Sequence, residues 1–142
     1  MTYCLDTNVI SELRKIGSGR ADPHVSAWAL TVYPEDFFTS VLCLAELEQG
    51  IVKKERQDPE QAYHLRNWLN GSVYPTFEGR ILNVDLNAAK IFASLRAHHN
   101  GPILDTLIAA TAISHNLILV TRNSADFANT GVKLLNPWDH QP

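Results

Sequence analysis

Short apolar runs alternate along the chain with longer segments in which apolar residues recur every three or four positions. The short runs predict strands, and the longer segments predict amphipathic helices. We expect five strands, at residues 2–5, 37–40, 80–84, 117–121 and 132–135. Strands that are apolar throughout suit a sheet covered on both faces, and strands alternating with helices suit parallel pairing. The pattern therefore predicts a three-layer α/β/α sandwich with a mainly parallel central sheet.

Capping residues mark the beginning of most of the helices. We expect a helix that is capped by Thr7 or Asn8 and runs to about Lys15, and further helices over 23–31 after Asp22, from Ser40, from Asp58 to about Asn70, from Asp85 to His99 and from Asp105 to Asn116. Gly71 is expected to end the helix that begins after Asp58. The helices that follow Ser40 and Asp58 should form an amphipathic hairpin, joined by a charged turn at residues 53–57.

The composition narrows the class of protein. The chain has 142 residues, 45% of them hydrophobic, and a net charge of −3, which favours one globular domain over residues 1–142. No basic leader precedes an apolar stretch, and no uncharged apolar run approaches the roughly 20 residues that cross a bilayer. We therefore expect a cytoplasmic protein with no membrane association, in which Cys4 and Cys43 remain reduced and buried.

Four acidic residues occupy positions that are unusual for solvated charges. They are Asp6 after the first strand, Glu46 within the helix that follows the second, Asp105 in the Ala-rich helix before the fourth, and Asp126 shortly after the fourth. Each has an ordinary explanation as a helix cap, a turn residue or a solvated charge. In parallel α/β sheets, however, functional sites gather beyond the carboxyl ends of the strands. We therefore interpret the four together as one acidic site.

Clustered carboxylates repel one another unless a cation neutralises them. Oxygen ligands without organised Cys or His residues favour Mg²⁺ or Mn²⁺. Such ions activate water and brace phosphate oxygens, so the acids indicate metal-assisted phosphodiester hydrolysis. An acidic protein that handles nucleic acid needs local positive charge to attract the phosphates, and Arg14, Lys15 and Arg122 are candidates for that role. His98 and His99 are adjacent on a predicted helix and point in different directions, which argues against a paired metal site.

Several motifs resemble those of PIN-domain nucleases, especially the VapC and FitB-type toxins of bacterial toxin–antitoxin modules. They are, in order, Asp6-Thr7-Asn8-Val9-Ile10-Ser11-Glu12, Glu46 followed by Gly50, Asp105-Thr106-Leu107-Ile108-Ala109-Ala110, Thr121-Arg122-Asn123 with Asp126-Phe127, and Asn136-Pro137-Trp138. The resemblance extends over essentially the whole chain.

The resemblance implies a Mg²⁺- or Mn²⁺-dependent endoribonuclease whose catalytic and metal-binding residues are Asp6, Glu46, Asp105 and Asp126. It also implies an RNA substrate, a homodimer, and inhibition by a small DNA-binding antitoxin of the VapB or FitA kind. Four further polar residues are candidates for a supporting role: Asn8, Thr121, Arg122 and Asn123.

Two other functions remain open from the sequence alone. One is a non-catalytic module of the same fold that binds RNA or protein. The other is a phosphatase that uses Asp6 as a nucleophile, although such enzymes usually carry a second acid two residues later, where this chain has Asn8.

Overall fold

The computed structural model describes all 142 residues and contains a five-stranded sheet in which every neighbouring pair is parallel. The strands are β1 (Tyr3–Leu5), β2 (Phe37–Ser40), β3 (Ile81–Leu82), β4 (Ile118–Val120) and β5 (Leu134–Leu135), in the order β3-β2-β1-β4-β5. The predicted α/β sandwich with a mainly parallel sheet is confirmed. All five strands lie within the predicted ranges, and four of them are shorter than predicted.

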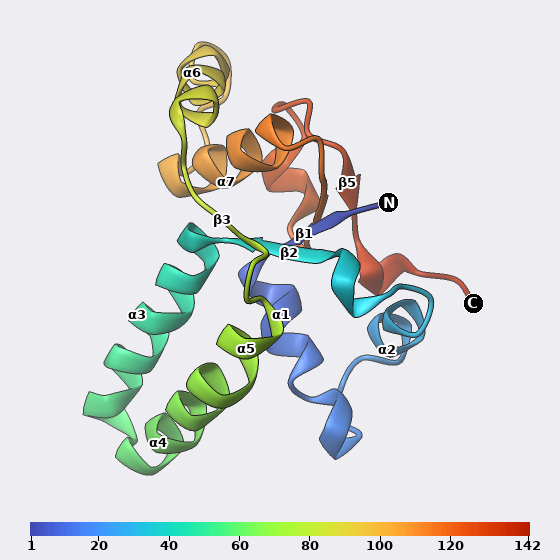
Figure 1. Cartoon of the computed structure of the whole chain (residues 1–142), viewed down its shortest axis with the longest axis vertical. Coiled ribbons are helices and arrows are strands. Elements are labelled where there is room, and N and C mark those ends of the chain that lie inside the picture. Colours follow the sequence, from blue (N-terminus) through green and yellow to red (C-terminus); the bar gives the residue numbers. More distant parts are fainter.

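Helices cover both faces of this sheet (Figure 1). They are α1 (Thr7–Leu13), α2 (Pro23–Ala29), α3 (Val41–Gln57), α4 (Pro59–Trp68), α5 (Tyr74–Thr76), α6 (Leu86–Leu95) and α7 (Ile103–Ser114). Figure 1 shows α6 and α7 on one side of the sheet and α1 to α5 on the other, with the α3–α4 hairpin extending away from it. No helix is both long enough and apolar enough to cross a membrane.

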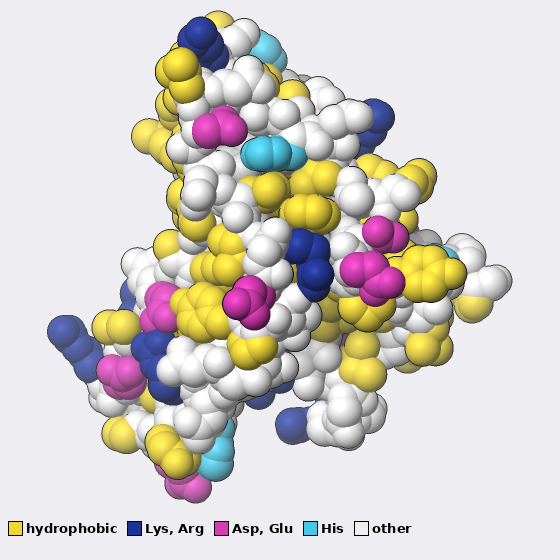
Figure 2. All heavy atoms as spheres, in the orientation of Figure 1, with side chains coloured by type: hydrophobic (Ala, Val, Ile, Leu, Met, Phe, Trp, Pro, Cys, Tyr) yellow, Lys and Arg dark blue, Asp and Glu magenta, His cyan; other side chains and the backbone are white.

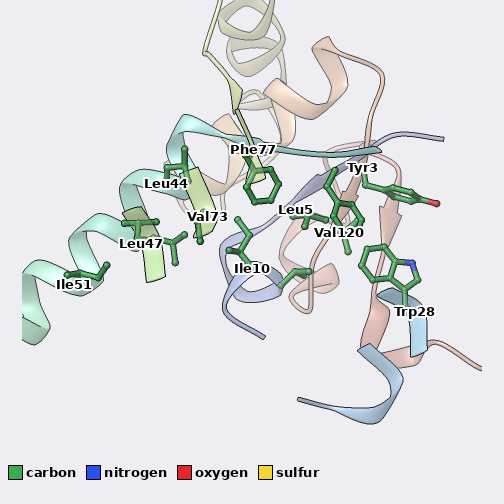
Figure 3. Close-up of a cluster of buried hydrophobic side chains, with 13 residues drawn as sticks. Tyr3, Leu5, Ile10, Trp28, Leu44, Leu47, Ile51, Val73, Phe77 and Val120 are labelled. Carbon is green, nitrogen blue, oxygen red and sulfur yellow. The ribbon is translucent and has the colours of Figure 1, made fainter. Parts of the chain in front are cut away.

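The two faces of the sheet build two separate apolar clusters. Successive side chains of a strand point to opposite faces. Tyr3 and Leu5 therefore join the larger cluster, while Cys4 joins the smaller one against α7. Figure 3 shows the larger cluster, where Leu44 and Leu47 of α3 point toward the sheet. This alternation explains why β1 and β4 are apolar at every position.

Most of the predicted helix starts are confirmed. Asp22, Ser40, Asp58 and Asp85 each accept a hydrogen bond from a main-chain N–H in the first turn of the helix that follows. The prediction for α1 was wrong by one residue or two, because its cap is Asp6, which accepts from the Thr7 N–H at 2.8 Å. The first cap of the chain is therefore also a candidate site residue.

Several other helix boundaries differ from the predictions, and α1, α2 and α7 each end about two residues early. Gly71 does not end the helix after Asp58, because a π-helical turn at Leu69–Val73 continues it into α5. Leu69 and Val73 are buried in that turn, so packing overrides the glycine signal. Helix α6 ends at Leu95 rather than His99, and α7 begins at Ile103, two residues before Asp105.

Strand order determines where the site lies. The central strands β1, β2 and β4 run in one direction, so their carboxyl ends meet at the same edge of the sheet. Asp6 follows β1, Thr121 follows β4, and α3 carries Glu46 away from the end of β2. Residues far apart in the chain are thereby brought to one place.

Candidate active site

Asp6 is the most buried of the four predicted acids, with only 5% of its surface exposed. Its Oδ1 accepts from the main-chain N–H of Thr7 at 2.8 Å, and its Oδ2 accepts from the Thr121 hydroxyl at 2.8 Å. The side-chain amide of Asn8 lies 3.4 Å from the same Oδ2. A buried carboxylate is costly unless it is hydrogen-bonded. These donors therefore fix the Asp6 carboxylate in place.

Glu46 lies beside Asp6 on the second turn of α3. Its Oε1 accepts a 2.7 Å hydrogen bond from the Thr7 hydroxyl. One possible ligand atom from each of Asp6, Cys43 and Glu46 lies within 4.8 Å of the others. Burial raises the pKa of the Glu46 carboxyl, and the charges of Asp6 and Asp105 raise it further, while the bond from Thr7 lowers it. Glu46 is thus held in a group of negative charges.

Asp105 lies in the first turn of α7, and its side chain makes no capping hydrogen bond there. Its role as a helix cap, which the sequence left open, is therefore not observed. Burial is the main cause that raises the pKa of this carboxyl, followed by the charges of Asp6 and Asp126. His99 acts in the opposite direction. Asp105 is therefore the acid on which the negative charges of both Asp6 and Asp126 act.

Asp126 lies in the 3₁₀ turn Ser124–Phe127 beyond β4 and is exposed. The turn has no side-chain cap. The negative charge of Asp126 is one of the causes that raise the pKa of Asp105.

No salt bridge neutralises this group. The four ion pairs of the protein involve other acids, namely Glu12, Glu48, Glu55 and Asp85. A set of carboxylates that repel one another and form no salt bridge fits a bound cation. The donors fit a hard ion such as Mg²⁺ or Mn²⁺, because burial raises the pKa of the Cys43 thiol well above its ordinary value and leaves it a poor ligand.

The predicted supporting residues connect the ends of β1 and β4. The Asn8 side-chain amide lies 3.3 Å from the Thr121 hydroxyl, and Asn8 Oδ1 accepts from the Arg122 main-chain N–H at 3.1 Å. The Asn123 N–H donates to Thr121 Oγ1 at 3.1 Å. Thr121 thus contacts Asp6 directly, whereas Asn123 contributes its main chain rather than its side chain in these bonds.

A groove of about 370 Å³ leads away from Glu46 between α1, α3 and α4. Thr7 and Glu46 line one part of it, and Arg14, Lys54 and Gln61 line another. Arg14 and Gln61 also line a second hollow of about 340 Å³ together with Lys15 and Arg20. Figure 2 shows, from one side, the hollow between the α3–α4 hairpin and the segment that connects α1 to α2. Glu46 therefore lines a groove whose other walls carry the basic side chains of Arg14 and Lys54.

Two arginines on this edge are held by aromatic rings. The Arg14 guanidinium carbon lies 5.6 Å from the centre of the Trp68 ring, and that of Arg122 lies 5.2 Å from the Trp138 ring. Both tryptophans pack partly against the larger apolar cluster, and Trp28 is buried within it. Trp28 is therefore a core residue, whereas Trp68 and Trp138 are half-buried at the margin of that cluster.

Three residues that contact the site or its acids were not predicted. Cys43 precedes Glu46 by three positions, so helical spacing alone could have placed the two on one face. Thr7 follows Asp6 directly, but nothing in the sequence indicates that its hydroxyl reaches Glu46. His99 is buried and approaches Asp105 and Asp126, and no pattern in the sequence indicates this.

The fold and the site define an α/β protein with a parallel sheet and with Asp6 and Glu46 gathered beyond the carboxyl ends of its central strands. The chain belongs to the PIN domain family, which it matches over residues 3–133.

Relatives within this family are named as ribonucleases and toxins. The chain is 36% identical over 140 residues to the VapC ribonuclease Y4jK of Sinorhizobium fredii, covering 95% of this chain and 96% of the relative. It is 37% identical over 140 residues to the toxin FitB of Neisseria gonorrhoeae, covering 94% and 96%. The solved structure of FitAcB from N. gonorrhoeae is similar over 97% of this chain and 99% of that chain, with a TM-score of 0.86 and 34% identity. The predicted resemblance is confirmed.

Proposed function

We propose that this protein is a Mg²⁺- or Mn²⁺-dependent endoribonuclease, the toxin of a toxin–antitoxin module. The observation that supports this most is the group formed by Asp6, Glu46, Asp105 and Asp126. Burial and mutual repulsion raise the pKa of Glu46 and Asp105, and no salt bridge compensates the group. Relatives that match nearly the whole chain are named as ribonucleases.

In this proposal the four carboxylates hold the ion, and each has a distinct environment. Bound there, the ion supplies activation of water and stabilisation of charge on the phosphate. Asp6 is fixed by Thr7 and Thr121, so it provides a rigid ligand. Glu46 is oriented by the Thr7 hydroxyl. Asp105 and Glu46 must lose any proton they carry before they bind a cation, so binding should strengthen as the pH rises.

The groove beyond Glu46 provides a path for the RNA strand. Arg14 lies where this groove meets the second, basic hollow, and the Trp68 ring holds its guanidinium in place. Lys15 is less available, because it pairs with Glu12 at 3.1 Å. Arg122 extends from the end of β4 on the same edge. We assign Arg14 and Arg122 to contacts with phosphates, which a protein of net charge −3 needs in order to attract RNA.

The two alternatives are less consistent with the geometry. A phosphatase would need Asp6 as a nucleophile, but Asp6 is 5% exposed and both of its oxygens accept hydrogen bonds. A module that only binds RNA or protein would not need an uncompensated acidic group.

Cleavage of a mixed RNA substrate with Mg²⁺ or Mn²⁺ tests the proposed activity. The wild-type protein should cut RNA only with the ion, and the ion should raise its melting temperature. A protein that gains no stability from Mn²⁺ and cuts nothing would be a binding module instead.

We also propose that the chain forms a homodimer and binds a small antitoxin that itself binds DNA, with both acting in the cytoplasm. Solved structures similar to this chain include FitAcB and FitAB bound to a DNA fragment, the latter with a TM-score of 0.86 and 31% identity. Light scattering at micromolar concentration tests the dimer. Expression from the native operon, followed by purification, tests whether a small partner accompanies the protein.

A further inference from the structure

The buried side chain of His99 bridges the two segments that carry Asp105 and Asp126. Only 5% of His99 is exposed. Its Nδ1 lies 2.7 Å from the hydroxyl of Thr106, the residue after Asp105, and its Nε2 lies 3.0 Å from the main-chain carbonyl oxygen of Asp126. One ring therefore contacts the immediate neighbourhood of two acids that are 21 positions apart in the chain.

The partners of the ring fix the direction of these hydrogen bonds. A carbonyl oxygen can only accept, so Nε2 carries a hydrogen and donates it to Asp126. Arg96 donates through Nη1 to the Gly101 carbonyl at 2.7 Å and to Thr106 Oγ1 at 3.2 Å. The Thr106 hydroxyl can then donate to Nδ1, with the Pro102 carbonyl at 3.3 Å as its other acceptor. A continuous chain of donors therefore runs from Arg96 to the main chain of Asp126.

Gly101 provides the space that this ring occupies. A Cβ atom at Gly101 would lie 2.8 Å from Cε1 and 2.9 Å from Nε2 of His99, which is closer than real Cβ atoms approach. Gly101 is not among the glycines with positive φ, so the backbone does not itself require glycine there. A side chain at this position would displace the ring from the hydrogen bond it makes with Asp126.

The two segments that His99 connects have no capping side chains of their own. The turn that carries Asp126 and the first turn of α7 both lack a side-chain cap, and Asp126 is exposed. The charge of Asp126 acts on Asp105, so repulsion favours their separation when no ion is bound. His98 adds an outer tie from the same segment, through Nε2 to the Asn129 carbonyl at 3.0 Å.

We propose that His99 is a positioning residue that holds the Asp126 turn at a set distance from Asp105, so that both carboxylates can face one divalent ion. The inference rests on the proposed function, because it assumes that these two acids bind the ion. His99 acts through the main chain of Asp126 and the side chain of Thr106, and it is not itself a ligand.

Two substitutions at His99 separate its two hydrogen bonds. Gln can place an amide N–H near the position of Nε2 and keep the bond to Asp126, whereas the shorter Asn reaches only the position of Nδ1. His99→Asn should weaken Mn²⁺ binding by roughly 10- to 100-fold, as expected when the partner of a metal ligand is removed. His99→Gln should weaken it less. Mn²⁺ binding is measured by calorimetry or by the EPR signal of free Mn²⁺.

Gly101→Ala provides an independent variant, because it moves the ring without removing any hydrogen-bonding group. It should weaken Mn²⁺ binding in the same direction as His99→Asn, and it remains informative if His99→Asn fails to fold. His64→Asn is the control, since His64 is exposed on α4, and it should bind Mn²⁺ as the wild type does.

The outcomes distinguish the inference from the proposed function. If the wild type binds no Mn²⁺, the proposed function fails, and this inference fails with it. If the wild type binds Mn²⁺ and the His99 and Gly101 variants melt at lower temperature with unchanged Mn²⁺ affinity, His99 is only structural and the inference alone fails. A loss of Mn²⁺ affinity that is larger for His99→Asn than for His99→Gln supports the positioning role of His99.

Discussion

The hydroxyl of Thr121 donates a 2.8 Å hydrogen bond to Oδ2 of Asp6, joining the residues that directly follow two neighbouring strands. Thr121 is completely buried, so water cannot replace this donor. The same hydroxyl accepts from the Asn123 N–H at 3.1 Å, which leaves its own hydrogen free for the carboxylate. The end of β4 thus orients the acid at the end of β1.

Thr121→Val tests this relationship, because Val has the same shape but cannot donate. Loss of a hydrogen bond to a buried charged group should lower the free energy of unfolding by about 1–3 kcal/mol, measured by chemical denaturation. Mn²⁺ affinity should also fall, by roughly 10- to 100-fold. Thr111→Val is the control, since Thr111 is equally buried but donates only to the Leu107 carbonyl within α7. An equal change of Mn²⁺ affinity in both variants would contradict the role assigned to Thr121.

Asp105→Asn should abolish RNA cleavage while leaving the protein folded. Asn keeps the size of the side chain and removes one negative charge from the group. The loss of activity should exceed the roughly 10- to 100-fold expected for an outer partner such as Thr121, because Asp105 is proposed to contact the ion itself. The assay is cleavage of a mixed RNA substrate, beside thermal melts with and without Mn²⁺. Retained cleavage with an unchanged Mn²⁺-induced shift in melting would remove Asp105 from the site.

The effect of Asp105→Asn on the stability of the metal-free protein should depend on pH. The folded state raises the pKa of Asp105 above its ordinary 3.8, so protonation favours the folded state. The stability from this carboxyl is fully present below pH 3.8 and is lost as the pH rises through the raised value. Asp105→Asn should therefore melt at higher temperature than the wild type at pH 7, and the difference should shrink as the pH falls toward 3.8. A difference that does not vary with pH would show that charge is not its cause.

Comparing the variant with the wild type is necessary because other acids change stability in the opposite direction. The Asp22 N–H is the main cause that lowers the pKa of Glu12, and Tyr74 and Arg66 lower that of Glu48. Stability from these two groups is present above their ordinary pKa and is lost as the pH falls through the lowered value. They are unchanged in Asp105→Asn, so their effect cancels in the difference.

Arg14→Gln should weaken RNA binding without changing metal binding. A contact with one phosphate adds about one to the slope of log affinity against log salt concentration, so the variant should show a slope smaller by about one. Binding to a non-cleaved RNA, with Asp105→Asn as the background, gives this slope directly. The matched control is Arg56→Gln, an exposed residue in the last turn of α3 that forms no salt bridge. An unchanged slope for Arg14→Gln would exclude Arg14 from the RNA path.

The periodicity of apolar residues predicted the fold well because the local pattern in each segment agrees with the strand or helix that the segment forms. Capping acids and a serine marked four helix starts correctly, since a cap is a local bond between neighbouring residues. The errors occurred where distant packing decides. Gly71 reads as a stop signal, but the burial of Leu69 and Val73 carries the helical turn through it.

The candidate acids could be listed from the sequence because parallel topology places strand ends together. Their hydrogen-bond partners could not be predicted in the same way. The bond from Thr7 to Glu46 spans 39 positions, and the contact of His99 with the Asp126 carbonyl spans 27. Such contacts depend on the angles between elements, and neither composition nor local spacing encodes those angles. The roles of the four acids themselves remain predictions.

The position of β1 between β2 and β4 affects how the chain folds while the ribosome synthesises it. β1 is made first, yet its pairing with β4 needs residues 118–120, near the other end of the chain. Contacts with such large sequence separation form slowly and late in folding. Asp6 therefore has no hydrogen bond from Thr121, and no Asp126 nearby, until most of the polypeptide has been synthesised. An interrupted chain that stops before β4 cannot assemble the acidic site, so hydrolytic capacity should arise only with the nearly complete protein.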